Sequence, residues 1–278
     1  MTEQFDVVAD GLAFPEGPRW HDGALWFSDM QGGTVYRVTP GQPKEQVVEV
    51  PNLPSGLGFL PDGRLLVVSM HDRKVLRLDP DGLHEHADLS QVASWHTNDM
   101  LVDPQGRAYV GTFGDASAPP DPVTPANLAL IAPDGAVSVA ATDMHLANGM
   151  ALTDGGRTLV VAETRALPPR ITAFDVADDG SLSGRRVLIE LTNELPDGIC
   201  ADADDNIWFA SPFTGEVIKV DTAGQIVARI RTPQAPYACA LGGEDGQTLF
   251  ICASDTWIPE QARAALAGQV FALRVNGG

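Results

Sequence analysis

Short apolar runs recur along the whole chain, and most of them end in a small residue followed by a polar one. The six runs are Leu25–Asp29, Leu65–Met70, Ala108–Thr112, Leu159–Glu163, Ile207–Ser211 and Leu249–Ala253. Runs of this length between turn residues are typical of buried strands. Their return at intervals of roughly forty to fifty residues predicts a repeat architecture.

Each run belongs to a longer unit. Turns such as Pro61-Asp62-Gly63 and Pro104-Gln105-Gly106 precede it and have the chemistry of hairpin loops. A further strand follows in every unit, at Thr34–Val38, Lys74–Leu78, Leu128–Ala132, Ile171–Val176, Glu216–Val220 and Val270–Val275. A fainter fourth strand is visible in places, for example at Gln46–Val50. This pattern predicts an all-β fold, a six-bladed β-propeller.

The two ends of the chain complete this picture. Phe5–Ala9 is a strand without a unit of its own, so we expect it to pair with Val270–Val275 and complete the last blade, which removes an open sheet edge. Pro259–Ala267 is the best helical candidate and reads as an insertion in the sixth unit.

Composition supports one domain over residues 1–278. Hydrophobic residues make up 44% of the chain, and no linker-like stretch divides it. No run is long enough to span a membrane, and Met1-Thr2-Glu3-Gln4 lacks the features of a secretory signal, so a cytoplasmic location is expected. The net charge of −19 argues against a nucleic-acid partner. Nothing in the pattern indicates a protein partner.

Familiar catalytic motifs are absent. The chain has no GxSxG, no HExxH and no Gly-rich phosphate loop. His84 and His86 have metal-like spacing but stand alone beside the turn Asp81-Gly82, so we interpret them as turn residues.

The residues that open each unit carry the most chemistry. If the units are equivalent, these residues lie at the inner ends of the blades and face the central channel: Glu16, Ser55, Asn98, Asn148, Asp197 and Tyr237. Four of them offer carboxylate or amide oxygens, a ligand set that suits one hard divalent ion, first of all Ca²⁺, with Mg²⁺, Mn²⁺ or Zn²⁺ as alternatives. Asx turns are the competing interpretation for Asn and Asp, but Glu makes no such turn.

Four motifs resemble those of the gluconolactonase family that includes senescence marker protein 30 (regucalcin). They are Phe14-Pro15-Glu16-Gly17-Pro18, Asn98-Asp99, Ala147-Asn148-Gly149-Met150 and Pro196-Asp197-Gly198-Ile199. The resemblance implies a six-bladed propeller that opens sugar lactones with one divalent ion held by Glu16, Asn148 and Asp197. It also implies that Asn98 contacts the substrate or completes the coordination.

The implied reaction is a metal-assisted hydrolysis. The ion would polarise the lactone carbonyl and activate water, and Asp197 would be the general base or a ligand only. His96 stands where many sugar-lactone members carry an Arg, which favours a less polar lactone unless His96 is an ordinary loop residue. Tyr237, with Met70, His71 and Trp257, could supply apolar walls or ordinary packing.

One long segment, Gly114–Asn127, would cover the channel mouth. It contains no Lys or Arg, which again indicates a substrate without strong negative charge. Two other functions stay open. One is a phosphotriesterase-like hydrolase that uses the same ion, and the other is a calcium-binding propeller without catalysis.

Overall fold

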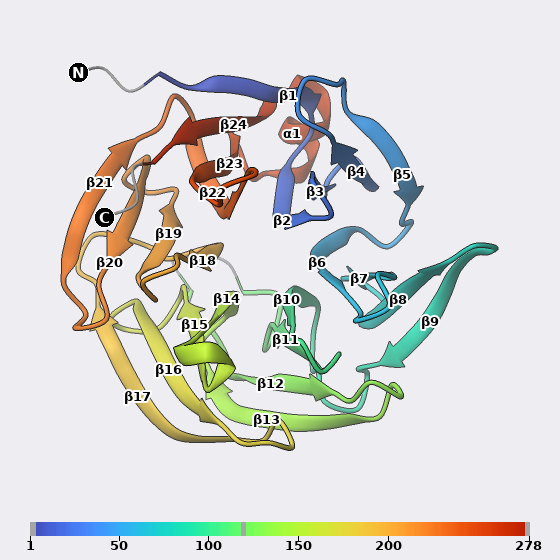
Figure 1. Cartoon of the computed structure of the whole chain (residues 1–278). Coiled ribbons are helices and arrows are strands. Elements are labelled where there is room, and N and C mark those ends of the chain that lie inside the picture. Colours follow the sequence, from blue (N-terminus) through green and yellow to red (C-terminus); the bar gives the residue numbers. More distant parts are fainter. Residues whose placement is uncertain (1–3, 118–120, 276–278) are drawn as a thin grey trace.

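The computed structural model describes residues 4–117 and 121–275, and these form six four-stranded antiparallel sheets arranged in a ring (Figure 1). The innermost strands are β2 (Pro15–His21), β6 (Pro54–Phe59), β10 (Thr97–Val102), β14 (Ala147–Thr153), β18 (Ile199–Ala201) and β22 (Ala235–Gly242). The second strands are β3 (Ala24–Asp29), β7 (Leu65–Ser69), β11 (Ala108–Thr112), β15 (Thr158–Glu163), β19 (Ile207–Ser211) and β23 (Thr248–Ser254). The prediction of an all-β, six-bladed propeller is confirmed.

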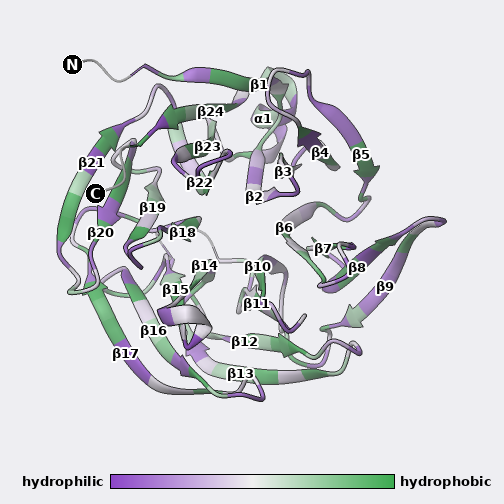
Figure 2. Ribbon diagram, viewed as in Figure 1, coloured by the Kyte–Doolittle hydropathy of each residue, from purple (hydrophilic) through white to green (hydrophobic). Residues whose placement is uncertain are grey.

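The outer half of each blade completes the four-stranded pattern. The third strands are β4 (Thr34–Val38), β8 (Lys74–Asp79), β12 (Ala126–Ile131), β16 (Arg170–Val176), β20 (Glu216–Val220) and β24 (Gly268–Arg274). The outermost strands are β5 (Glu45–Glu49), β9 (Gly82–Asp88), β13 (Val137–Met144), β17 (Leu182–Glu190), β21 (Ile226–Arg231) and β1 (Asp6–Leu12). Figure 2 shows that β5 is largely hydrophilic, as expected for a strand with exposed side chains at Glu45, Gln46 and Glu49.

The six apolar runs are the second strands, and none of their ends is displaced by more than one residue. These strands are buried on both faces because sheets of neighbouring blades pack against them. Leu25 and Phe27 of β3, for example, are fully buried and share a cluster with Phe250 and Cys252 of the sixth blade. Burial on both faces explains why the runs are continuously apolar rather than alternating.

The last blade is closed by the first strand, as predicted. β1 pairs antiparallel with β24, and Val7 lies opposite Phe271. Figure 1 shows this pairing as the blue strand beside the red one. The pairing covers the free edge of β24, so the ring is held together by hydrogen bonds between the two ends of the chain.

The predicted helix is present between β23 and β24 but is shorter than expected. α1 (Pro259–Ala265) ends because Leu266 adopts the left-handed conformation, with φ of 46°. Among residues 4–117 and 121–275, the other helical element is the short 3₁₀ turn η1 (Asp154–Gly156). In the part of the chain that the structure describes, no helix has the length and apolar character needed to cross a bilayer.

Neighbouring inner strands approach closely at a glycine in several blades. A Cβ atom on Gly56 would lie 2.2 Å from the Met100 nitrogen, and one on Gly149 would lie 2.3 Å from the Ile199 nitrogen. The Gly198 nitrogen donates a hydrogen bond to the Tyr237 oxygen of the next blade at 2.8 Å. Glycine follows the opening residue because the next blade leaves no room for a side chain.

Candidate active site

The opening residues of the blades lie at irregularities of the inner strands. The pairing of β2 with β3 is shifted between Glu16 and Arg19, and that of β14 with β15 is shifted between Ala147 and Met150. In the fifth blade, Asp197 lies outside the regular strand as well, because β18 begins only after it, at Ile199. Bulges of this kind turn a side chain out of the regular alternation of a strand, here toward the channel.

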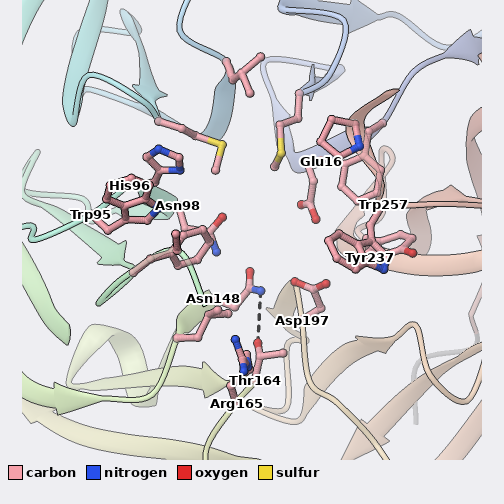
Figure 3. A pocket seen from close by; sticks show the side chains of 18 of the residues that line it. Glu16, Trp95, His96, Asn98, Asn148, Thr164, Arg165, Asp197, Tyr237 and Trp257 are labelled. Carbon is pink, nitrogen blue, oxygen red and sulfur yellow. Dashed lines mark hydrogen bonds between the residues drawn. The ribbon is translucent and has the colours of Figure 1, made fainter. Parts of the chain in front are cut away.

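These side chains meet at the bottom of a cavity of about 680 Å³ at one end of the channel. Figure 3 shows Glu16, Asn98, Asn148 and Asp197 pointing into a common space from four different blades. Tyr237 also lines this cavity, whereas Ser55 is buried behind it. The sequence therefore predicted correctly where five of the six opening residues lie, while their roles stay predictions.

Glu16 and Asp197 form a buried pair of carboxyl groups, each about 8% exposed. Burial, followed by the charges of Asp197 and Asp99, raises the pKa of Glu16 well above its ordinary value. Burial and the charge of Asp99 raise the pKa of Asp197 to about 8. Ionised carboxylates gathered in this way are unfavourable without a cation. The electrostatics of the site therefore suit a bound positive ion.

The Asn148 amide is oriented by Thr164, which is the residue after β15. The Asn148 Nδ2 atom donates to Thr164 Oγ1 at 3.2 Å, and Thr164 Oγ1 donates to the Pro196 oxygen at 2.7 Å. This chain of hydrogen bonds turns the Asn148 oxygen toward the space it shares with Glu16 and Asp197 (Figure 3). The donor set thus fits a hard cation, which prefers carboxylate and amide oxygens.

Asn98 is held from the neighbouring blade. The Ser55 hydroxyl donates to Asn98 Oδ1 at 3.3 Å, and the Ser28 hydroxyl donates to the Ser55 main-chain oxygen at 2.6 Å. Within the described residues, Asn98 and Asn148 make no Asx-turn hydrogen bond, in contrast to outer turn residues such as Asp103. The turn interpretation of the two amides is therefore wrong.

An ion pair lies beside the carboxyl groups, on the side away from the cavity mouth. Arg19 Nη2 contacts Asp99 Oδ1 at 2.9 Å, and Arg19 also donates to the main-chain oxygens of Pro18 and Met100. The Asp99 carboxylate is therefore already paired with a guanidinium, although its charge still acts on Glu16 and Asp197. Asp99 occupies the position that glycine takes after Glu16, Ser55 and Asn148.

Aromatic rings form the walls above these polar groups. The His96 ring packs against His71 at 4.3 Å and against Trp95 at 4.7 Å between ring centroids. Burial, then the charges of His71 and Arg73, lowers the pKa of His96, so its ring is neutral at pH 7. On the other side of the cavity, Figure 3 shows Tyr237 and Trp257.

Several cavity residues were not found by the sequence reasoning. Thr164 and Arg165 follow β15, Gln31 follows β3, and Arg263 lies on α1. No spacing pattern marks them, because they lie in connections that differ from blade to blade. Thr164 and Arg165 do stand directly after a predicted buried strand, and polar residues at such a place are the available signal.

The segment Gly114–Asn127 contributes to the cavity mouth as expected. Asp115, Ala116, Ser117 and Val123 line the cavity, and Asn127 already belongs to β12. Residues 118–120 lie outside the described part of the chain.

A second cluster of possible ligands lies on the second blade. Asp79, Asp81 and His84 are close enough to share an ion. Asp79 is already paired with Arg77 at 2.6 Å and with Arg64 at 3.1 Å, and Asp81 and His84 are exposed. These pairings favour a surface ion-pair cluster, and His86 is not one of the three clustered residues.

Comparisons with known proteins agree with the predicted family and fold. The family model described as the SMP-30/Gluconolactonase/LRE-like region matches residues 14–255. The pentonolactonase XacC of Haloferax volcanii is 27% identical over 88% of this chain and 83% of its own length. The 6-deoxy-6-sulfogluconolactonase of Pseudomonas putida is 27% identical over 97% of this chain and 94% of its own length.

A solved structure shows the same fold. The calcium-binding protein regucalcin of Agrobacterium tumefaciens superposes with a TM-score of 0.82, at 23% identity, over 98% of this chain and 94% of that one. The matched region contains the opening residues of all six blades, from Glu16 to Tyr237. The chain therefore belongs to the SMP-30/gluconolactonase/LRE-like family.

Proposed function

We propose that this protein is a lactonase that hydrolyses the ring ester of a small lactone with the help of one divalent ion. The observation that carries the proposal is the convergence of Glu16, Asn148 and Asp197 on one buried space at the bottom of a cavity. The lactonase names of two relatives support the reaction class. The whole chain of 278 residues acts as one domain in this proposal.

Glu16, Asn148 and Asp197 would hold the ion, which we propose to be Ca²⁺. Two carboxylates and an amide oxygen are hard ligands without nitrogen or sulfur, and such sets favour Ca²⁺, Mg²⁺ or Mn²⁺ over softer ions. The regucalcin neighbour, described as a calcium-binding protein, supports the choice of Ca²⁺. When bound, the ion would supply Lewis acidity toward the lactone carbonyl.

The remaining steps belong to the side chains. Asp197 would take the proton of the attacking water and return it to the leaving alkoxide, which opens the ring and yields a hydroxy acid. Asn98, fixed by Ser55, would orient the substrate with its amide, since an amide moves no protons at neutral pH. His96 and Tyr237 would pack against the lactone ring as neutral walls.

Acid release from a lactone panel tests this function. The metal-loaded protein is offered aldonolactones and simple alkyl or aryl lactones in a pH-indicator assay, beside chelator-treated protein and the variants Asp197→Ala and Glu16→Ala. We expect release that needs the ion and falls by at least about a hundredfold in both variants, as is typical when a group central to the chemistry is removed. Asp178→Asn, an exposed carboxylate in the turn before β17, is the matched control.

Two outcomes would replace the proposal. Faster cleavage of organophosphate triesters than of any lactone would favour the phosphotriesterase reading. Stoichiometric binding of the ion without turnover of any ester would favour a calcium-binding propeller. If the ion content of Asp197→Ala and Glu16→Ala stays stoichiometric, the ion site lies elsewhere.

A further inference from the structure

Two arginines line the cavity although the protein as a whole is strongly acidic. Arg165 follows Thr164 at the end of β15, and Arg263 lies on α1. The chain has 18 basic residues against 37 acidic ones, so most arginines are expected to find a carboxylate. Arg170 and Arg185, for example, both pair with Glu163.

Neither cavity arginine has such a partner among the described residues. Arg165 Nη1 donates to the Ser117 main-chain oxygen at 2.8 Å, and its Nη2 donates to the Asp121 main-chain oxygen. Arg263 Nη1 donates to the Gln31 side-chain oxygen at 3.0 Å. Because these acceptors are neutral, both guanidinium groups keep their full charge at the cavity wall.

Asp115 also lines the cavity, and its carboxylate feels the charge of Arg165. Its oxygens accept hydrogen bonds from the Ser117 nitrogen at 2.8 Å and from the Thr124 hydroxyl, and it forms no ion pair with Arg165. An ion held by Glu16 and Asp197 would offset those two carboxylates. The lining would then carry one net positive charge, from Arg165, Arg263 and Asp115.

Arg165 is also well placed to act on a bound lactone. Figure 3 shows it beside Thr164, whose hydroxyl accepts a hydrogen bond from Asn148 at 3.2 Å, and Arg165 lines the same cavity as the proposed ion ligands. Its hydrogen bonds to Ser117 and Asp121 hold the side chain in one position. A cation that is already ordered loses little conformational entropy when it binds an anion.

We propose that the substrate is a lactone bearing an anionic group, a carboxylate, sulfonate or phosphate, and that Arg165 binds this group. The inference rests on the proposed lactonase function and names the substrate class of the same site. It differs from the expectation of a less polar, uncharged substrate, which was drawn from His96 and from residues 114–127. The charge comes instead from Arg165 in the fourth blade, together with Arg263 on α1.

Matched lactones test the proposal. One is an aldonolactone with a terminal CH₂OH group, and the other has the same ring with a terminal carboxylate. We expect wild type to prefer the anionic lactone in kcat/KM by about tenfold or more, since a hydrogen bond to a charged group is worth roughly 1.5–3 kcal/mol and 1.4 kcal/mol is tenfold. R165Q should lose most of this preference, mainly through KM. R157Q, which removes an exposed arginine in the turn after η1, should keep it.

The same comparison distinguishes the charge from a structural role. If R165Q lowers kcat/KM equally for both lactones, Arg165 only holds Ser117 and Asp121 in place, and the proposal is overturned. If wild type prefers the neutral lactone, it is overturned as well.

A binding measurement covers the case in which no lactone is hydrolysed. Titration calorimetry measures the affinity of wild type and of R165Q for each of the two ring-opened acids, the aldonate and the aldarate. Tighter binding of the aldarate to wild type, lost in R165Q, supports the anion site even if the lactonase proposal fails. Equal binding of the two acids overturns it.

Discussion

A single hydroxyl orients one of the proposed ion ligands. Thr164 Oγ1 accepts from Asn148 Nδ2 at 3.2 Å and donates to the Pro196 main-chain oxygen, so it links the fourth blade to the residue before Asp197. The Asn148 amide also hydrogen-bonds to the Asp197 carboxyl group, so Thr164 and Asp197 together orient it. The ligand therefore depends on a residue that is not a ligand.

Replacing Thr164 by valine should weaken binding of the ion without removing any ligand. We expect Thr164→Val to lower Ca²⁺ affinity by about 10- to 100-fold, because the Asn148 amide can then rotate. Titration calorimetry measures the affinity, and Thr164→Ser, which keeps the hydroxyl, is the control. Unchanged affinity in Thr164→Val would show that Asn148 is held by other contacts.

At the residue scale, the sequence predicted some of the cavity residues and missed others. Glu16, Asn98, Asn148 and Asp197 were found because each opens a repeated unit, and equivalent positions in a ring face the same axis. Thr164 and Arg165 were not found because the connection after the second strand, although present in every blade, differs in sequence from blade to blade. A repeat pattern predicts residues at positions that all blades share, but it does not predict residues that occur in one blade only.

At the scale of elements, an ion cluster fixes the connection that carries Thr164 and Arg165. Glu163, the last residue of β15, is fully buried and pairs with Arg170 at 2.9 Å and Arg185 at 3.1 Å. Burial alone would raise the pKa of Glu163, but hydrogen bonds from Arg170, Thr172 and the His145 main chain lower it to about 2. The cluster thereby ties β15 to β16 and β17.

Glu163→Gln should destabilise the protein at neutral pH by about 2–3 kcal/mol, because it leaves two partly exposed arginines without their carboxylate. The folded pKa of Glu163 lies below the ordinary 4.5, so its contribution is complete above pH 4.5 and is lost as the pH falls toward 2. Urea unfolding at pH 7 and pH 3 measures both effects.

The difference between wild type and Glu163→Gln should therefore shrink at pH 3. Glu85→Gln, which removes an exposed pair with Lys74, is the matched control and should change stability by less than about 1 kcal/mol. An equal difference at both pH values would mean that the charge of Glu163 does not contribute.

The strands were predicted accurately because burial determines both their sequence pattern and their packing. The second strands are buried on both faces, so they are continuous apolar runs, and β11 and β19 match the predicted bounds. The innermost strands were harder to see because bulges and glycines interrupt their alternation. α1 is shorter than predicted because nothing in its Ala-rich composition marks the left-handed Leu266.

The whole molecule depends on the pairing of its first strand with its last. Removing residues 1–12 would delete β1, expose the edge of β24 and remove Leu12, which is fully buried. We expect a lower urea midpoint and concentration-dependent light scattering, since an unpaired edge promotes association. Removing only residues 1–4 is the control, and identical behaviour of the two truncations would show that β1 is dispensable.

A bound ion should also stabilise the whole fold against unfolding, because its proposed ligands come from three blades. At a free Ca²⁺ concentration one hundred times Kd, binding stabilises the native state by about 2.7 kcal/mol, which corresponds to a rise in Tm of roughly 5 °C for a chain of this size. Differential scanning calorimetry of wild type and Glu16→Ala measures it. A rise that is the same in Glu16→Ala would place the ion at another site.

The pairing of β1 with β24 also sets an order of events during synthesis. All proposed ion ligands, from Glu16 to Asp197, leave the ribosome before β24 (Gly268–Arg274) has been made. Until then β1 has no partner, and the sixth blade cannot hold β22 between the fifth blade and the first. A growing chain thus carries every proposed ligand before the ring that arranges them has closed, so we expect affinity for the ion to arise only after β24 has paired with β1.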